Sequence, residues 1–221
     1  MALHIVITGA NRGIGLALTQ QYCAAGAKVT ALCRRSSTAL EGTGANVVAG
    51  VDMQAIDDLH TLGELLGNEP IDILINNAGI LRNETLGALE ANTIREQFEV
   101  NALAPMLVTE QLLGNMPDGA KVIFITSRMG SISDNGSGGY YGYRMSKAAL
   151  NAGAQSMARD LAQRGIAVGI IHPGFVQTDM VGGAGDISAS GSAANIIARI
   201  DEVKLSHSGR FVHADGSDLP W

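Results

Sequence analysis

In three runs along the chain, apolar residues follow one another without polar residues at every second position. They read IVIT from Ile5, DILIN from Asp72 and VIFIT from Val122. A strand with one face in water alternates between apolar and polar residues, whereas a continuous apolar run is typical of a strand covered on both faces. The pattern therefore predicts a parallel sheet with helices on each side.

Strand-like runs alternate with helical segments along the whole chain. The predicted strands are His4–Thr8, Lys28–Cys33, Asn46–Gly50, Ile71–Asn76, Lys121–Thr126, Ala167–His172 and Gly209–Val212. The predicted helices are Gly13–Ala25, Ala55–Leu66, Ile94–Asn115, Tyr143–Gln163 and Ser192–Val203. This order predicts an α/β fold with a single Rossmann-type doubly wound parallel β-sheet of about seven strands. No linker or repeat divides residues 1–221, so we expect one domain.

A glycine-rich turn, TGANRGIG from Thr8 to Gly15, follows the first predicted strand. In a doubly wound sheet, this turn lies at the carboxyl ends of the strands, where ligands bind. Gly9 permits a tight turn, and Gly13 and Gly15 let the backbone come close to a ligand. The helix N-terminus that follows suits a pyrophosphate, because its N–H groups are unpaired and its dipole is positive. The spacing is TGxxxGxG rather than GxGxxG, so the turn alone is an unspecific sign of nucleotide binding.

Three further motifs fall at the same predicted sheet edge. NNAG follows the DILI strand, and HPG ends the strand at His172. In YRMSK, Tyr143 and Lys147 are four residues apart and therefore lie on one face of a helix.

With these motifs the chain resembles the classical short-chain dehydrogenase/reductase family over almost its whole length. TGANRGIG, NNAG, the asparagine of FEVNA, a serine after VIFIT, YRMSK and HPGFVQTDM follow the order and spacing of that family. The resemblance implies an oxidoreductase that transfers hydride between a nicotinamide cofactor and a carbonyl or alcohol substrate. Within this family, a carbonyl reductase is the activity we expect.

The resemblance makes Tyr143 the catalytic acid/base and Lys147 its partner. A phenol has a pKa near 10, and an ammonium group one helical turn away favours the phenolate. By resemblance, Lys147 also binds the nicotinamide ribose. Tyr140 and Tyr141 are competitors for the catalytic role, but neither has a lysine one turn further on.

Two more catalytic residues are expected from the resemblance. Ser127 would bind and orient the substrate carbonyl, with Ser131 and Ser133 as rivals because the gap to Tyr143 is a few residues longer than usual in the family. Asn101 would interrupt its helix and hold a water linked to Lys147.

The basic residues indicate which nicotinamide cofactor binds. An acidic residue at the end of the second strand would accept a hydrogen bond from a ribose 2′-hydroxyl, but Arg34 and Arg35 stand there. Arg12 in the glycine-rich turn would face the same point. Two guanidinium groups match a 2′-phosphate in charge and geometry, so we expect NADP(H). The alternative is that these arginines are solvated surface residues.

The other expected cofactor contacts belong to four turns of the same edge. Asp52 and Met53 would contact the adenine. The glycine-rich turn, the ribose site and the nicotinamide end would be formed by Gly9, Asn11, Arg12, Gly13, Ile14, Gly15, Asn77, Ala78, Gly79, Pro173, Gly174, Val176 and Thr178, together with Tyr143 and Lys147.

Charge and composition narrow the expected partners. The net charge is −6, which argues against a nucleic-acid partner. No apolar stretch is long enough to span a bilayer, and the N-terminal residues lack the pattern of a signal peptide. Cys23 and Cys33 have no metal-ligand spacing, so we expect free thiols, no metal and a cytoplasmic protein.

A short substrate loop is expected at about residues 179–191. It contains three glycines and only Met180 and Val181 as apolar side chains near its start, so we expect it to be poorly ordered without ligand and to form a permissive pocket. The helices at 94–115 and 143–163 pair subunits in many relatives, so we expect a homo-oligomer. Two other functions remain open: a dinucleotide-binding signalling or redox-sensing protein with little turnover, and a methyltransferase, which would leave YRMSK unexplained.

Overall fold

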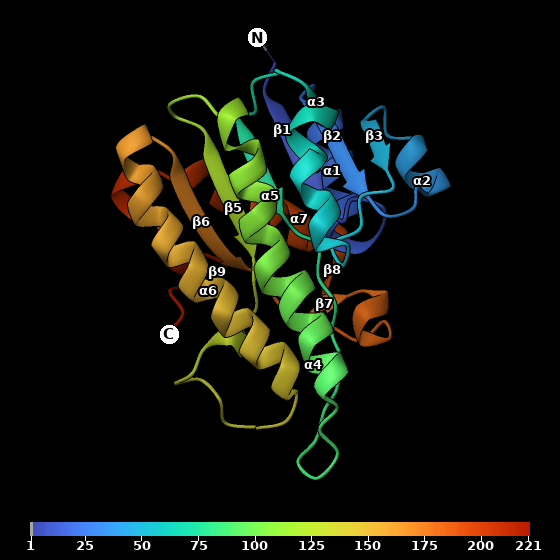
Figure 1. The fold of residues 1–221 in the computed structure, drawn as a ribbon, viewed down its shortest axis with the longest axis vertical. Helices are drawn as coiled ribbons and strands as arrows, with labels where there is room; N and C mark the ends of the chain where they lie inside the picture. The colour runs from blue at the N-terminus through green and yellow to red at the C-terminus, as the bar shows by residue number, and fades with distance from the viewer. Residues whose placement is uncertain (1) are drawn as a thin grey trace.

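A parallel sheet of seven strands forms the centre of the computed structural model, which describes residues 2–221 (Figure 1). The strand order is β3-β2-β1-β4-β5-β6-β9, and every neighbouring pair is parallel. The strands are β1 His4–Thr8, β2 Lys28–Cys33, β3 Asn46–Ala49, β4 Ile73–Asn76, β5 Lys121–Ile125, β6 Ala167–His172 and β9 Phe211–His213. The predicted fold class is confirmed.

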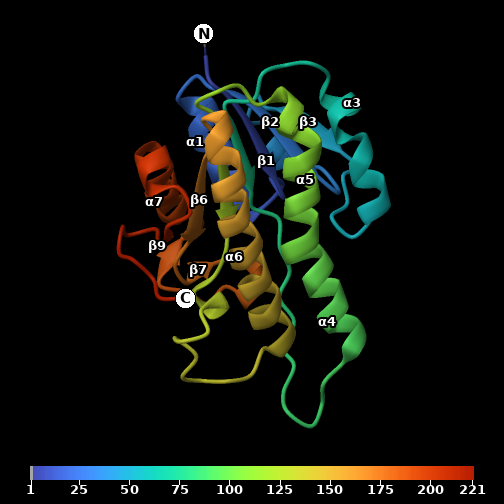
Figure 2. The same cartoon turned by 60° about the vertical axis from the view of Figure 1, so that its left-hand side comes forward.

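Helices cover both faces of this sheet. They are α1 Gly13–Ala24, α2 Thr38–Glu41, α3 Leu62–Leu66, α4 Ala91–Phe98, α5 Ala104–Leu112, α6 Tyr141–Leu161 and α7 Ala189–Glu202. Figures 1 and 2 show α5 and α6 on one face of the sheet and α1 and α7 on the other.

The core explains why the apolar runs do not alternate. Successive residues of β1 point to opposite faces: Ile5 and Ile7 pack with the cluster under α1 and α7, and Val6 packs with the cluster under α5 and α6. The same alternation occurs in β5, where Phe124 and Ile123 lie in the two different clusters. Each face is buried, so each position must be apolar.

Two predicted helices differ from the observed elements. The segment expected at 55–66 is a 3-10 helix, Ile56–Thr61, followed by the short α3. The helix expected at 94–115 begins at Ala91 and contains a π-helical segment, Glu99–Leu103, between α4 and α5. A π segment has hydrogen bonds that span five residues instead of four and is frequent at functional sites, and apolar periodicity alone does not reveal it.

The substrate loop has more structure than we expected. Asp179–Val181 form a 3-10 turn, and β8 Ile187–Ser188 pairs in parallel with β7 Val176–Gln177. The amides of Asp186 and Ile187 both donate to the Phe175 carbonyl. These backbone hydrogen bonds close the loop on itself, which the glycine content did not indicate.

The order of the strands places the ligand site. Chain order reverses between β1 and β4, and ligands of open α/β sheets bind at such a switch point, beyond the carboxyl ends of the strands. The glycine-rich turn after β1 and the NNAG turn after β4 meet there. Of the helices described in residues 2–221, none is long and apolar enough to cross a membrane.

Gly15 tests how tightly helix α1 packs on this edge. A Cβ at Gly15 would overlap the Gly9 carbonyl oxygen and lie 2.6 Å from Asn77 Nδ2. We expect Gly15→Ala to lower the free energy of unfolding by about 1–3 kcal/mol, because the added methyl meets backbone. Thermal unfolding should shift down by about 2–4 °C per kcal/mol in a chain of this size. Gly114→Ala is the control, because nothing lies within 4 Å of its Cβ position; equal midpoints for the two variants would contradict the expected packing.

Candidate active site

A cleft of about 560 Å³ lies at the carboxyl ends of the strands, within the size range of small-molecule sites. It extends from the arginines after β2, past the glycine-rich turn, to Tyr143 and Lys147 on α6. Its lining includes most of the predicted cofactor residues: Gly9, Asn11, Arg12, Gly13, Ile14, Arg34, Arg35, Asp52, Met53, Asn77, Ala78, Gly79, Pro173 and Thr178. Gly15, Gly174 and Val176 were also predicted but do not line it.

The glycine-rich turn is held by the NNAG turn. The Thr8 hydroxyl accepts hydrogen bonds from the amides of Asn77 and Ala78, both at 3.0 Å. The Asn77 side-chain amide donates to the carbonyls of Thr8 at 3.0 Å and Gly9 at 3.2 Å. Gly9 has φ +65° and would bring a Cβ within 2.9 Å of Ala78 Cα, so a side chain fits neither the conformation nor the space.

A narrow backbone cradle results on the floor of the cleft. A Cβ at Gly13 would lie 3.3 Å from the Thr178 methyl across the cleft. The first turn of α1 starts at Gly13 and directs its unpaired N–H groups and positive dipole end into this space. The residues present therefore fit a dinucleotide pyrophosphate.

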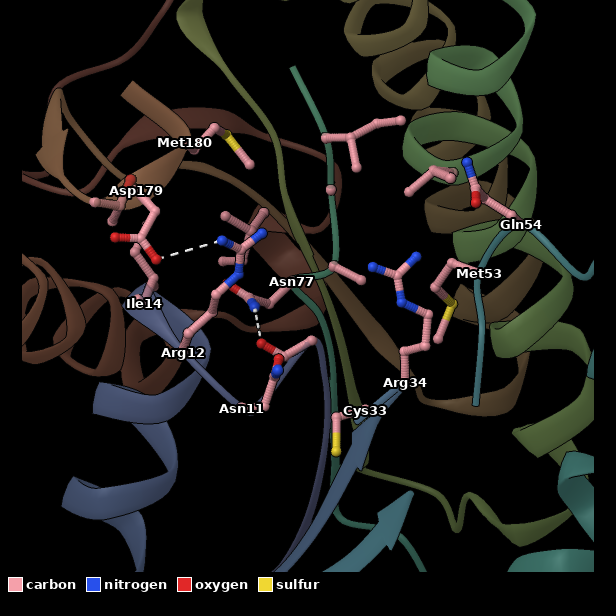
Figure 3. Close-up of a pocket in the computed structure, with 18 of the residues that line it drawn as sticks. Asn11, Arg12, Ile14, Cys33, Arg34, Met53, Gln54, Asn77, Asp179 and Met180 are labelled. Atoms are coloured by element: carbon pink, nitrogen blue, oxygen red, sulfur yellow. Dashed lines mark hydrogen bonds and ion pairs between the residues drawn. The ribbon is translucent and has the colours of Figure 1, made fainter. Parts of the chain in front are cut away.

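The arginines are arranged differently from the expectation that two of them face one point. Arg12 Nη1 lies 3.3 Å from Asp179 Oδ2, and Arg34 Nη1 lies 3.7 Å from Asp52 Oδ2. Figure 3 shows Arg12 reaching toward Asp179, while Arg34 stands beside Met53. The two arginine side chains are 63% and 64% exposed. Exposed pairs of this kind are worth at most about 1 kcal/mol, so both guanidinium groups can exchange their partner for a ligand anion.

Tyr143 and Lys147 are buried at the other end of the cleft. Lys147 Nζ lies 5.9 Å from the centre of the Tyr143 ring and donates a hydrogen bond of 3.0 Å to the Ile125 carbonyl. Burial lowers the pKa of Lys147 to about 8, so the group is mostly an ammonium at neutral pH.

The phenol differs from the expectation that Lys147 favours its ionised form. Burial raises the pKa of Tyr143, and a hydrogen bond with Ser127 lowers it to a smaller extent. Desolvation disfavours phenolate, and this outweighs the other effects at the site. The phenol of Tyr143 therefore carries its proton at neutral pH.

Three serines were candidates for the position beside the phenol. Of the three, Ser127 is the one whose side chain lowers the pKa of the Tyr143 phenol, and its hydroxyl caps the following 3-10 turn by accepting from the Met129 amide. Ser131 accepts from the Asp134 amide, and the Ser133 hydroxyl donates to the Trp221 carbonyl. Ser131 thus bonds within its own loop, and Ser133 ties that loop to Trp221.

Asn101 lies fully buried in the π-helical segment. Its amide donates to the Ile80 carbonyl at 2.8 Å and to Ser146 Oγ at 3.0 Å, and its Oδ1 accepts from the Ile80 amide at 2.8 Å. A Cβ at Gly79 would lie 3.2 Å from Asn101 Oδ1 and 3.7 Å from Lys147 Nζ. Gly79 therefore leaves open the space between the asparagine and the lysine.

Several lining residues were not among the predicted contacts. Asp179 follows the predicted Thr178 directly and is the partner of Arg12. Near the arginine end, Arg82 pairs with Glu96, and Gln54 also hydrogen-bonds Glu96. Asp179 could have been found from its place in QTDM, whereas no sequence signal distinguishes the other three.

Comparisons with known proteins agree with this geometry. The short chain dehydrogenase family model matches residues 3–186. The chain is 35% identical over 223 residues to 1-hydroxy-2-glutathionyl-2-methyl-3-butene dehydrogenase of Rhodococcus sp. strain AD45, covering 98% of this chain and 99% of the relative. It is 43% identical over 155 residues to C-signal of Myxococcus xanthus, covering 69% and 93%.

A solved structure extends the likeness to the whole chain. NADPH-bound carbonyl reductase from chicken fatty liver superposes with a TM-score of 0.89 at 27% identity, covering 100% of both chains. Together with the family match and the cleft at the β1–β4 switch point, these likenesses identify the chain as a member of the short-chain dehydrogenase/reductase family of oxidoreductases.

Proposed function

We propose that this protein is an NADP(H)-dependent carbonyl reductase with Tyr143 as the proton donor. The observation that carries the proposal is the composition of the two ends of one cleft. A buried, protonated phenol with Lys147 beside it occupies one end, Arg34 and Arg35 occupy the other, and Arg12 lies in the glycine-rich turn between them.

The arginine end supports NADP(H) over NAD(H). β2 ends at Cys33 and is followed by Arg34 and Arg35, so no carboxylate follows the strand directly to bind a 2′-hydroxyl or repel a 2′-phosphate. A phosphate dianion matches the guanidinium fork better than Asp52 does, because it offers more charge and more acceptor oxygens. The chicken carbonyl reductase with a similar fold is described with NADPH bound.

The residues at the other end would carry the proton chemistry. When bound, NADPH supplies a hydride to the substrate carbonyl carbon. The Ser127 hydroxyl would bind the carbonyl oxygen, and the Tyr143 phenol would donate its proton to that oxygen. The Lys147 ammonium would stabilise the phenolate left behind and supply the proton that restores the phenol. Asn101 would hold a water through which Lys147 recovers that proton from solvent.

A signalling protein with little turnover is the second candidate. C-signal, to which the chain is 43% identical over 155 residues, is named as a signal rather than as an enzyme. Such a role would not require the buried constellation of Ser127, Tyr143, Lys147 and Asn101, so measured turnover distinguishes the two functions.

Arg34→Asp tests the choice of cofactor. We expect the dissociation constant for NADPH to rise at least about tenfold, because a charge-assisted hydrogen bond is lost and a like charge is introduced. Relative use of NADH should improve. Arg159→Asp makes the same change of charge at an exposed position of α6. It should leave the dissociation constant for NADPH and the relative use of NADH unchanged. If Arg34→Asp binds NADPH as the parent does, the assignment of the arginine is wrong.

Tyr143→Phe tests the proton donor. Only the phenol oxygen is removed, so NADPH should bind as before, whereas turnover should fall by about 10²–10⁴-fold. Tyr140→Phe and Tyr141→Phe serve as controls and should keep the parental rate. Near-parental turnover of Tyr143→Phe, measured as NADPH consumption, would assign the acid to another residue.

A panel of aldehydes, ketones and quinones tests both turnover and the permissive pocket. Met180 lines the cleft, is 40% exposed and offers only apolar contact. One methylene in such a contact discriminates by about 10–200-fold at most, so small and medium apolar carbonyl compounds should stay within about that range of kcat/KM. A single compound preferred by several orders of magnitude would contradict the permissive pocket, and the absence of any turnover would favour the signalling role.

A further inference from the structure

Glu84 is a buried carboxylate that the proposed chemistry does not use. Its side chain lies in the loop between NNAG and α4, and the residue is only 2% exposed. Oε1 accepts hydrogen bonds from Thr93 Oγ1 at 2.8 Å and Gln97 Nε2 at 2.7 Å, and Oε2 accepts from the Gly142 amide at 3.0 Å. A carboxylate is kept in such a place only when hydrogen bonds replace its lost hydration.

The Gly142 contact supplies a helix cap from a distant segment. Helix α6 starts at Tyr141, and its N-cap residue, Tyr140, makes no side-chain capping bond. The first amides of a helix have no partner within the helix, and its positive dipole end favours an anion. Glu84 meets both requirements by accepting from the amide of Gly142, the residue that precedes Tyr143.

The packing around this cap leaves almost no freedom of movement. A Cβ at Gly142 would overlap Gln97 Nε2 and lie 3.1 Å from Glu84 Oε1. Gln97 is itself fully buried, and its Oε1 accepts from the Arg82 amide at 2.8 Å. The first turn of α6 is therefore fixed against α4 through Glu84 and Gln97.

A second contact of Glu84 holds a strained residue. Tyr140 has φ +52°, and it is the single non-glycine residue with positive φ in the described part of the chain. Its amide donates to the Glu84 carbonyl at 3.0 Å. Such a conformation persists only where the surroundings determine it, and it occurs often beside active sites.

We propose that Glu84 is a positioning residue that holds the start of α6, and through it the Tyr143 phenol, in the reactive geometry. The inference rests on the proposed reductase function. Lys147 lies one turn further on and is anchored separately by the Ile125 carbonyl. Loss of the cap therefore displaces the phenol more than the cofactor side of the site.

Glu84→Gln is the test, because the shape is kept while one of the two acceptor oxygens becomes an NH₂ group that faces donors. We expect amide hydrogen exchange in the first turn of α6, at Gly142 and Tyr143, to become faster in the free protein. With NADPH and the fastest substrate of the carbonyl panel, kcat should fall by about 10- to 100-fold, because small displacements of the reacting groups lower the rate by factors of this size. The dissociation constant for NADPH should stay within about twofold.

A control separates positioning from a general loss of stability. In Ser208→Ala, the Val168 amide at the start of β6 loses its acceptor, so the protein is destabilised near the C-terminal half of α6 and far from its first turn. Its kcat should remain parental. If Glu84→Gln does not fold, Thr93→Val removes one donor to the same carboxylate and should lower kcat by about two- to tenfold; a parental kcat in that variant would overturn the proposal.

Combination with Tyr143→Phe decides whether Glu84 acts through the phenol. In that background, Glu84→Gln should lower the residual rate by less than about twofold, because the group it positions is already absent. An equal fall in both backgrounds, or a parental kcat for Glu84→Gln alone, overturns the proposal. If Tyr143→Phe itself keeps full activity, the proposed function has failed instead, and exchange at Gly142 still reports whether Glu84 caps the helix.

Discussion

The hydrogen bonds between Thr8 and the NNAG turn are the contacts on which the cleft depends. They join the ends of β1 and β4, the two strands between which the chain order reverses. Because Asn77 also holds the carbonyls of Thr8 and Gly9, the glycine-rich turn cannot move independently of the sheet. The start of α1, and with it the position of Arg12, follows from this one junction.

A second set of contacts places the far end of the cleft. The π-helical segment places the Asn101 side chain where it hydrogen-bonds both the amide and the carbonyl of Ile80. The same side chain donates to Ser146 of α6. Glu84 and Gln97 then attach the loop after NNAG to the start of the same helix. The loop after β4 and the helical segment from α4 to Leu103 therefore converge on α6 through buried polar groups, each of which needs its partners.

Much of this arrangement could be predicted from the sequence. Continuous apolar runs such as VIFIT identify strands buried on both faces, and the order of strands and helices leads to a sheet whose carboxyl ends share one edge. Motifs at those ends, including TGANRGIG and YRMSK, then had to lie near one another. These predictions rest on period and order, which are local properties of the chain.

The remaining features depend on contacts between distant segments. Nothing in ILRNETL marks Glu84 as a cap for a helix that begins more than fifty residues later, as the two positions in the sequence show. The raised pKa of Tyr143 is likewise a result of burial, which the spacing to Lys147 does not reveal. The pairing of Arg12 with Asp179 and of Arg34 with Asp52 needed the folded positions of four turns.

Those two ion pairs also give the cleft a built-in competitor for anions. An anion that binds Arg12 or Arg34 displaces Asp179 or Asp52, so a small monovalent ion that makes one such contact replaces one anion by another and gains little. A ligand that reaches several points of the cleft at once displaces the carboxylates with the support of its other contacts. Selection among anions then depends on the length and valency of the ligand rather than on positive charge, in keeping with a chain whose net charge is −6.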